Sequence, residues 1–164
     1  MAGRAGRGPL GGEVIVQTFN PDHYSIQAAS QHDYCAFYDR EIRYREELGY
    51  PPFCHLANIW VSAEDEEKAK RVAEEVARCL MADTRGDEGF AKGFAGGERC
   101  MISGPVPAPL YELRNRYRWL ILLKAPDWPP LCETINRGLA RMRKATTSVA
   151  DVRISVDVDP LDML

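Results

Sequence analysis

The chain has 164 residues, with 21 lysines and arginines against 24 aspartates and glutamates, and 45% of its residues are hydrophobic. This length and composition fit one soluble domain, or a small domain with an appendage. No apolar run approaches the roughly 18 to 20 residues that cross a bilayer, and the start of the chain contains no apolar segment of signal-peptide type. We therefore expect a cytoplasmic protein without a membrane-spanning segment.

The cysteine pattern fits this compartment. The five cysteines are odd in number, lie at least 19 positions apart and include no C-x-x-C pair. This spacing predicts reduced thiols and no zinc motif, and no other residue set in the chain predicts a cofactor. The cysteines are Cys35, Cys54, Cys79, Cys100 and Cys132.

Charge is distributed unevenly along the chain, although the net charge is only −3. Residues 64–88 carry nine acids and five bases, and residues 150–164 carry four acids and one base. Residues 104–144 carry eight bases and three acids, a net charge of +5. This third segment alone has the charge to bind a polyanion, and an ordinary solvated surface with a local excess of bases is the alternative interpretation.

The beginning of the chain predicts a loop, one strand and two helices. Glycines dominate the first 12 residues and predict a loop, and the apolar alternation that starts at Val14 predicts a strand. Apolar residues at spacings of three and four then predict helices over about 22–30 and 33–48. The segment 49–52, Gly-Tyr-Pro-Pro, ends the second helix, since neither proline can continue it. We place the domain boundary here and divide the chain into 1–49 and 50–164.

Residues 50–164 predict six elements in the order βαββαβ, which is the split βαβ arrangement of an α+β domain within the broad α/β class. Alternating apolar residues predict the strands, apolar stripes at helical spacing predict the helices, and the glycines of 86–97 predict a connecting loop. We expect two of the strands to pair as a long-looped hairpin and both helices to lie on one face of the sheet. The elements are strand 53–61, a helix after Asp65, strands 100–106 and 117–124, a helix after Asp127 and strand 152–158.

No residue set predicts catalysis by this chain alone. The three histidines are not spaced with Cys, Asp or Glu as metal ligands, and the glycine-rich loop lacks the G-K-[ST] ending of a phosphate-binding loop. Three aspartates of the last strand resemble a cation site, but solvent-facing acids also protect an edge strand from aggregation, and we favour that role. The aspartates are Asp151, Asp157 and Asp159.

The segment 114–119 combines three arginines with two aromatic residues at the start of a predicted strand. Guanidinium groups bind phosphates, and aromatic rings stack on bases without reading their sequence, so the pattern predicts contact with single-stranded or branched nucleic acid. Both rings point the same way as Ile121 and Leu123, which leaves a core role open for them. The predicted DNA-contacting residues are Arg114, Arg116, Tyr117, Arg118, Trp119 and Lys124.

The segment 2–8, AGRAGRG, is the most specific string in the chain. It resembles the end of the last conserved motif of superfamily 2 helicases, Q-x-x-G-R-x-G-R, whose arginines reach the phosphates of an ATP held by the other RecA-like lobe. Further strings are similar, in order, to the bacterial primosomal protein N-prime family, whose members are ATP-dependent helicases that restart stalled replication forks. The resemblance covers essentially the whole chain. These strings are residues 12–23, 50–53, 104–108, 117–119 and 157–160.

The resemblance implies that the chain is the C-terminal portion of such a helicase, called here the parent helicase. Residues 1–49 are then the tail of its second lobe, and the remainder is a domain that resembles ribosomal protein S ten. Arg4 and Arg7 are implied to contact ATP only within the parent, where an arginine finger neutralises charge on the phosphoryl oxygens. ATP, magnesium and zinc are implied for the parent alone, because their motifs lie outside this sequence.

Two hypotheses of different classes follow. In the first, the C-terminal domain contacts forked or single-stranded DNA and supports assembly with primosome proteins. In the second, it is an interaction platform for the other helicase domains or for an acidic partner tail such as that of single-strand binding protein. The bases expected to serve the second role are Arg137, Arg141, Arg143 and Lys144.

Overall fold

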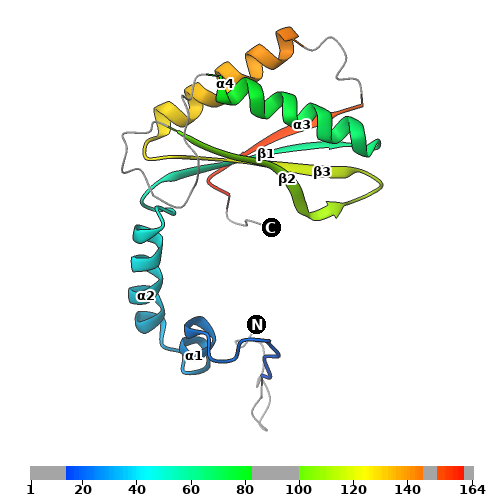
Figure 1. The fold of residues 1–164 in the computed structure, drawn as a ribbon. Helices are drawn as coiled ribbons and strands as arrows, with labels where there is room; N and C mark the ends of the chain where they lie inside the picture. Colours follow the sequence, from blue (N-terminus) through cyan, green and yellow to red (C-terminus); the bar gives the residue numbers. More distant parts are fainter. Residues whose placement is uncertain (1–13, 83–99, 146–150, 161–164) are drawn as a thin grey trace, which may run out of the picture. The chain divides into compact units, whose positions relative to one another are not determined.

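The computed structural model describes residues 14–82, 100–145 and 151–160 (Figure 1). The chain divides into two compact units, residues 1–42 and 43–164, which are called here unit 1 and unit 2. The predicted domain boundary after residue 49 lies further along the chain than this division. The predicted glycine-rich loop, Arg4 and Arg7 lie outside the described residues.

Unit 1 contains α1 (Tyr24–Ser30) and most of α2 (Tyr34–Glu47), which confirms both predicted helices. Side chains cap both N-termini, because the imidazole of His23 accepts a hydrogen bond from the Ser25 amide and the Asp33 carboxylate accepts one from Ala36. The Tyr24 ring stacks on Phe37, with 6.2 Å between the ring centroids. Neither helix contains a buried residue.

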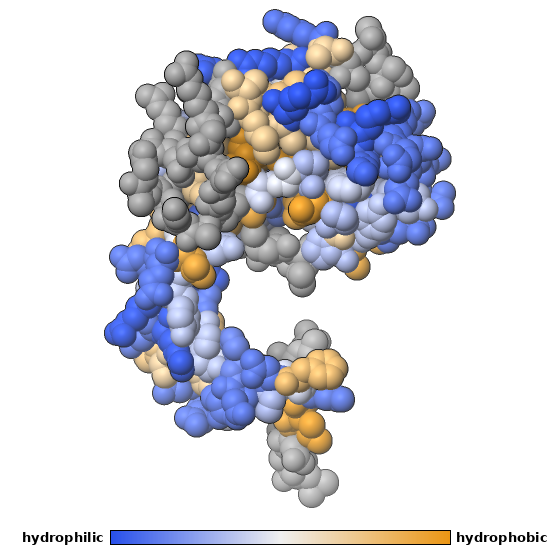
Figure 2. Space-filling view, in the orientation of Figure 1, coloured by the Kyte–Doolittle hydropathy of each residue, from blue (hydrophilic) through white to orange (hydrophobic). Residues whose placement is uncertain are grey.

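The strand predicted from Val14 onward is wrong, because residues 14–18 form no strand. Ile15 is 85% exposed, and the Phe19 side chain is fully exposed. Figure 2 shows apolar side chains at the surface at this end of unit 1. A strand needs a neighbouring strand to satisfy its backbone hydrogen bonds, and the described residues of unit 1 supply none.

Unit 2 is a four-stranded antiparallel sheet with the strand order β2-β3-β1-β4. Helices α3 and α4 lie together on one face of this sheet (Figure 1). The element order confirms the predicted βαββαβ arrangement and its split βαβ connection. The bounds are β1 His55–Ala63, α3 Glu66–Met81, β2 Met101–Glu112, β3 Tyr117–Ala125, α4 Trp128–Ala145 and β4 Arg153–Val158.

The core of unit 2 lies between the sheet and the two helices. Alternate residues of β1 and β3 point toward the helices, and those at the centre of the core are 0% exposed. The predicted stripes of α3 and α4 meet them, and α3 begins at Asp65, whose carboxylate accepts a hydrogen bond from the Lys68 amide at 2.6 Å. The sheet residues of this core include Ala57, Ile59, Val61, Ile121, Leu123 and Ala125.

Strand β2 is longer than predicted, because the sequence predicted an end at residue 106 followed by a long loop. The strand contains three prolines and continues to Glu112, and only residues 113–116 separate it from β3. Prolines fit here because β2 is an edge strand, where an amide is not needed on the outer side. Gly104 forms a bulge with φ of +101°, where a Cβ atom would lie 2.7 Å from the Leu120 carbonyl oxygen.

All five cysteines are free thiols in the structure. Burial raises the pKa of Cys100 to about 11 and also raises the pKa of Cys54, whose thiol donates a hydrogen bond to the Gly49 carbonyl at 2.8 Å. Buried thiols of this kind are structural and unreactive at neutral pH.

Candidate nucleic-acid interface

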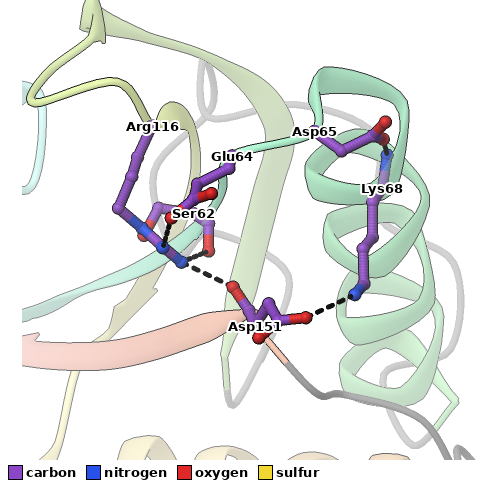
Figure 3. A network of polar contacts seen from close by, with 6 residues as sticks. All are labelled: Ser62, Glu64, Asp65, Lys68, Arg116 and Asp151. Carbon is purple, nitrogen blue, oxygen red and sulfur yellow. Dashed lines mark hydrogen bonds and ion pairs between the residues drawn. The ribbon is translucent and has the colours of Figure 1, made fainter.

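The six predicted DNA-contacting residues lie in different environments. Arg116 has a structural role, called here the Arg116 latch, because it links two strand ends. Its guanidinium donates hydrogen bonds to the carbonyl oxygens of Ser62, at 2.9 Å, and Asp151, at 2.6 Å. It also lies 3.7 Å from the Glu64 carboxylate (Figure 3). Lys68 of α3 reaches the Asp151 carboxylate from the other side, at 3.7 Å. Arg116 therefore joins the end of β1 to the start of β4, and it is not placed to receive a phosphate.

Lys124 is also unsuited to the predicted role, because only 1% of it is exposed. Its ammonium group donates a hydrogen bond to the Leu48 carbonyl and lies 4.7 Å from the centre of the Tyr50 ring. Burial lowers its pKa. Lys124 thus fastens the segment after α2 to β3.

Tyr117 and Trp119 lie on the sheet face that the helices cover, as the alternative interpretation of the sequence expected. Both rings contact Tyr111 of β2, at centroid distances of 5.6 and 6.3 Å, and Trp119 packs against the core. The Tyr111 hydroxyl donates a hydrogen bond to Glu66 at 2.6 Å, which raises the pKa of Tyr111 to about 12. The acidic start of α3, residues 64–67, lies beside this cluster and would repel a phosphate backbone.

Arg114 and Arg118 are the predicted residues that the fold leaves able to meet a ligand. Arg114 is exposed in the β2–β3 turn, with φ of +54°. Arg118 lies in β3 and points away from the helices, toward Trp60 of β1. Its guanidinium carbon is 4.5 Å from the centre of the Trp60 ring, which is a cation–π contact.

Trp60 and Arg118 belong to the sheet face that α3 and α4 do not cover, called here the second face. The strand register places Ser62 between Arg118 and Arg153, and Trp60 between Leu120 and Ser155. Arg153 and Ser155 are exposed, and the other members of these two rows are half-buried. The residues further along this face are Leu56, Asn58 and Lys124, and all three are buried.

Trp60 and Arg153 were not predicted from the sequence as members of the second face. The alternation of β1 places Trp60 on the face opposite its core residues. Because β1 is apolar on both faces, however, its sequence does not indicate which face the helices cover. Arg153 comes from a different strand, far along the chain from Arg118, and only the antiparallel pairing through β1 brings them onto the same row.

The bases assigned to the alternative role lie on α4 and are exposed. Arg137 forms an ion pair with Glu133 one turn earlier. Arg143 and Lys144 lie in the last turn of α4, where a positive charge interacts favourably with the helix dipole. Arg141 lies on the same helix and has an interaction partner. These residues form a basic end of α4, away from the second face of the sheet.

The aspartates at the last strand have separate roles. Asp159 accepts hydrogen bonds from the Leu56 amide and bonds to the His55 ring, each at 3.0 Å, whereas Asp151 belongs to the Arg116 latch. Among the described residues, no cluster of three or more His, Cys, Asp or Glu side chains is arranged to hold a metal ion. Within the same residues, no helix is long and apolar enough to cross a membrane.

Comparison with known proteins places the chain in a family. Residues 46–161 match the family model described as "Primosomal protein N C-terminal domain". The chain is 34% identical to the replication restart protein PriA of Bacillus subtilis over 100% of the chain and 19% of that protein. The identity is 32% to the protein of the same name from Synechocystis, over 99% of the chain and 17% of the relative. The identity to the protein of the same name from Haemophilus influenzae is 31%, over 99% of the chain and 20% of that relative.

By its fold, unit 2 is a small α+β domain of split βαβ topology, and it follows a short helical unit along the chain. The chain belongs to the family of PriA replication restart proteins and corresponds to their C-terminal portion. It spans about a fifth of the length of these three relatives.

Proposed function

We propose that the chain is the non-catalytic, DNA-contacting C-terminal segment of a cytoplasmic replication-restart helicase. It binds single-stranded or forked DNA and supports primosome assembly. The other helicase domains are its partners in the parent, where ATP, magnesium and zinc are bound and where Arg4 and Arg7 act on ATP. The observation that carries the proposal is the exposure of Arg114 and the outward direction of Arg118 at one end of the sheet.

Electrostatics favours the second face over the helix-covered face as the DNA-contacting surface. On the helix-covered side of this end, Glu66 and Glu67 occupy the first turn of α3, and the Glu66 carboxylate accepts a hydrogen bond from Tyr111. The second face carries Arg118 and Arg153 there, the nearby Glu64 is paired with Arg116, and Asp157 lies two rows away beside Asn58. A phosphate backbone is attracted to clustered arginines and repelled by clustered carboxylates, so DNA should approach the second face.

Titration of labelled fork DNA into the full chain tests this proposal. The double variant Arg114→Ala/Arg118→Ala should weaken binding about equally for unrelated sequences. Its slope of log affinity against log salt should fall by roughly 0.7 to 0.9 for each phosphate that the variant no longer binds. The matched control is Arg71→Ala/Arg78→Ala on α3, which removes the same charge from exposed positions on the other side of the sheet. Equal losses in both double variants would contradict the proposal.

We also propose that the chain alone hydrolyses no ATP. An arginine finger stabilises a transition state only when another site holds the nucleotide and its metal. Phosphate release should therefore stay at the background of a blank with and without fork DNA. DNA-stimulated turnover by a contaminant-free preparation would show a catalytic site in this chain.

The second candidate function is an interaction platform at the basic end of α4. The exposure of Arg143 and Lys144 in one helical turn favours it, since an acidic peptide such as the tail of single-strand binding protein would meet two adjacent cations. Arg143→Glu/Lys144→Glu should abolish binding of an acidic peptide and leave the binding of fork DNA at the second face unchanged. The reverse result would favour DNA contact by α4.

A further inference from the structure

We infer that Trp60 and Arg118 together form a stacking platform for a base of single-stranded DNA on the second face, an inference that rests on the proposed function. The guanidinium carbon of Arg118 lies over the Trp60 ring, 4.5 Å from its centre, so the indole holds this group on the second face. A guanidinium plane held in this way is a surface on which a base stacks, and it also carries the positive charge that a phosphate requires.

The surroundings of the pair fit one strand of DNA. Arg153 lies on the same row as Arg118 with Ser62 between them, which separates their backbones by two strand spacings, roughly 9 to 10 Å. This distance leaves room for a base between two cations that bind the phosphates on either side of it. Leu120 and Ser155 flank Trp60 and add a flat, uncharged border.

The platform is specific for unpaired DNA because base faces are accessible in a single strand and covered in a duplex. In a duplex the base faces are covered by their neighbours, and a sheet face meets only phosphates. In a single strand every base offers an aromatic face, and stacking on it does not depend on base identity. Binding to the Trp60–Arg118 platform should therefore distinguish single strands from duplexes and should not distinguish one sequence from another.

The experiment titrates the full chain with a labelled oligothymidine and, separately, with a blunt duplex that carries the same number of phosphates. Trp60→Leu leaves the Arg118 guanidinium without the ring that holds it and should weaken binding of the single strand by roughly 5- to 100-fold, the range expected when one stacked base is lost. It should change duplex binding less than twofold. Trp60→Phe keeps a ring and should restore most of the affinity. Trp128→Leu, which removes a 44% exposed tryptophan from α4, is the matched control and should change neither affinity.

Arg118→Lys separates stacking from charge, because lysine keeps the positive charge and loses the planar group. The platform predicts that this variant loses single-strand affinity and keeps duplex affinity. Equal and small changes for both DNAs would show that Arg118 acts only as a charge and would overturn the inference.

Cross-linking provides a readout that does not depend on the folding of a variant. Irradiation of the unaltered chain with an oligonucleotide that contains 5-iododeoxyuridine should yield an adduct on the β1 peptide that contains Trp60 or on the β3 peptide that contains Arg118. An adduct confined to other peptides would overturn the inference. If the chain binds neither DNA, the proposed function fails together with this inference. If it binds DNA through Arg114 and Arg118 but Trp60→Leu has no selective effect, only the inference fails.

Discussion

Unit 1 and unit 2 come from one chain but differ in what holds them together. In unit 2 the residues at the centre of the core are fully buried between a sheet and two helices. In unit 1 neither helix buries a residue, and Ile15 and Phe19 are almost entirely exposed. Local signals such as caps and ring contacts are therefore enough to start helices, whereas a stable tertiary structure needs an apolar surface that is removed from water.

The comparison also explains the strand that the sequence predicted and the structure lacks. Residues 14–18 alternate as a strand does, but strand formation needs a partner, and β1 of unit 2 has one on each side. Residues 14–42 contain no buried side chain in the structure, so their apolar residues form no core of their own. Unit 2 should then fold without them.

The largest expected effect tests this contrast directly. Ile59→Ala opens a cavity at a residue that is 0% exposed, and we expect the free energy of unfolding to fall by about 2–5 kcal/mol. Ile15→Ala removes the same atoms from a residue that is 85% exposed, and its effect should stay within about 0.5 kcal/mol. Urea unfolding followed by circular dichroism measures both. Similar losses in the two variants would show that unit 1 has a core of its own.

The second prediction separates two arginines that are neighbours in sequence. Arg116→Ala removes hydrogen bonds from a charged donor to the Ser62 and Asp151 carbonyls and should destabilise unit 2 by about 2–3 kcal/mol. Arg114→Ala changes an exposed turn residue and should alter stability by less than about 0.5 kcal/mol. Thermal unfolding measures these effects.

For DNA binding we expect the opposite order, with a larger effect of Arg114→Ala than of Arg116→Ala. At a temperature where both variants are folded, Arg114→Ala should lower the salt slope of fork binding and Arg116→Ala should leave it unchanged. A lower slope for Arg116→Ala would mean that this side chain leaves its two carbonyl partners to meet a phosphate.

The sequence predicted the elements of unit 2 well because each carries its own periodic pattern, as the strict alternation of the last strand does. It predicted the candidate site less well, because membership of a surface depends on the pairing of distant strands. The arginines of 114–119 look equivalent in sequence, yet Arg116 turns to backbone carbonyls and Arg118 turns to a ring on β1. Trp60 could be assigned to the second face only once both helices were known to lie on the other face.

The third prediction concerns the contact between α3 and α4, which both bury apolar residues, whereas neither helix of unit 1 buries a residue. A Cβ atom on Gly138 would lie 2.5 Å from a methyl carbon of Leu80 and 3.1 Å from its Cα, so the helices approach closely only because residue 138 has no side chain. Gly138→Ala should destabilise unit 2 by about 1–3 kcal/mol through overpacking. An exposed glycine in a helix gives the opposite sign, since alanine there stabilises by about 1 kcal/mol. A raised melting temperature for Gly138→Ala would show that α3 and α4 can move apart to accommodate the methyl group without a loss of folding free energy.

The smallest expected effect is a pH dependence at the end of β4. Partial burial raises the pKa of Asp159, but the hydrogen bonds with His55 and the Leu56 amide and the charge of His55 outweigh it, so the pKa lies below its ordinary value. A carboxylate with a lowered pKa stabilises the folded state above its unfolded pKa of 3.8, and this stabilisation is lost as the pH falls through the lower, folded value. The Asp159 side chain is 45% exposed, so solvent screening should keep the effect below about 1 kcal/mol. Urea unfolding at pH 7 and at pH 3 should therefore show a smaller difference for Asp159→Asn than for the unaltered chain, and Asp157→Asn, at an exposed position of β4, is the matched control. If the two variants behave alike, the contact of Asp159 with β1 adds nothing to the stability of unit 2.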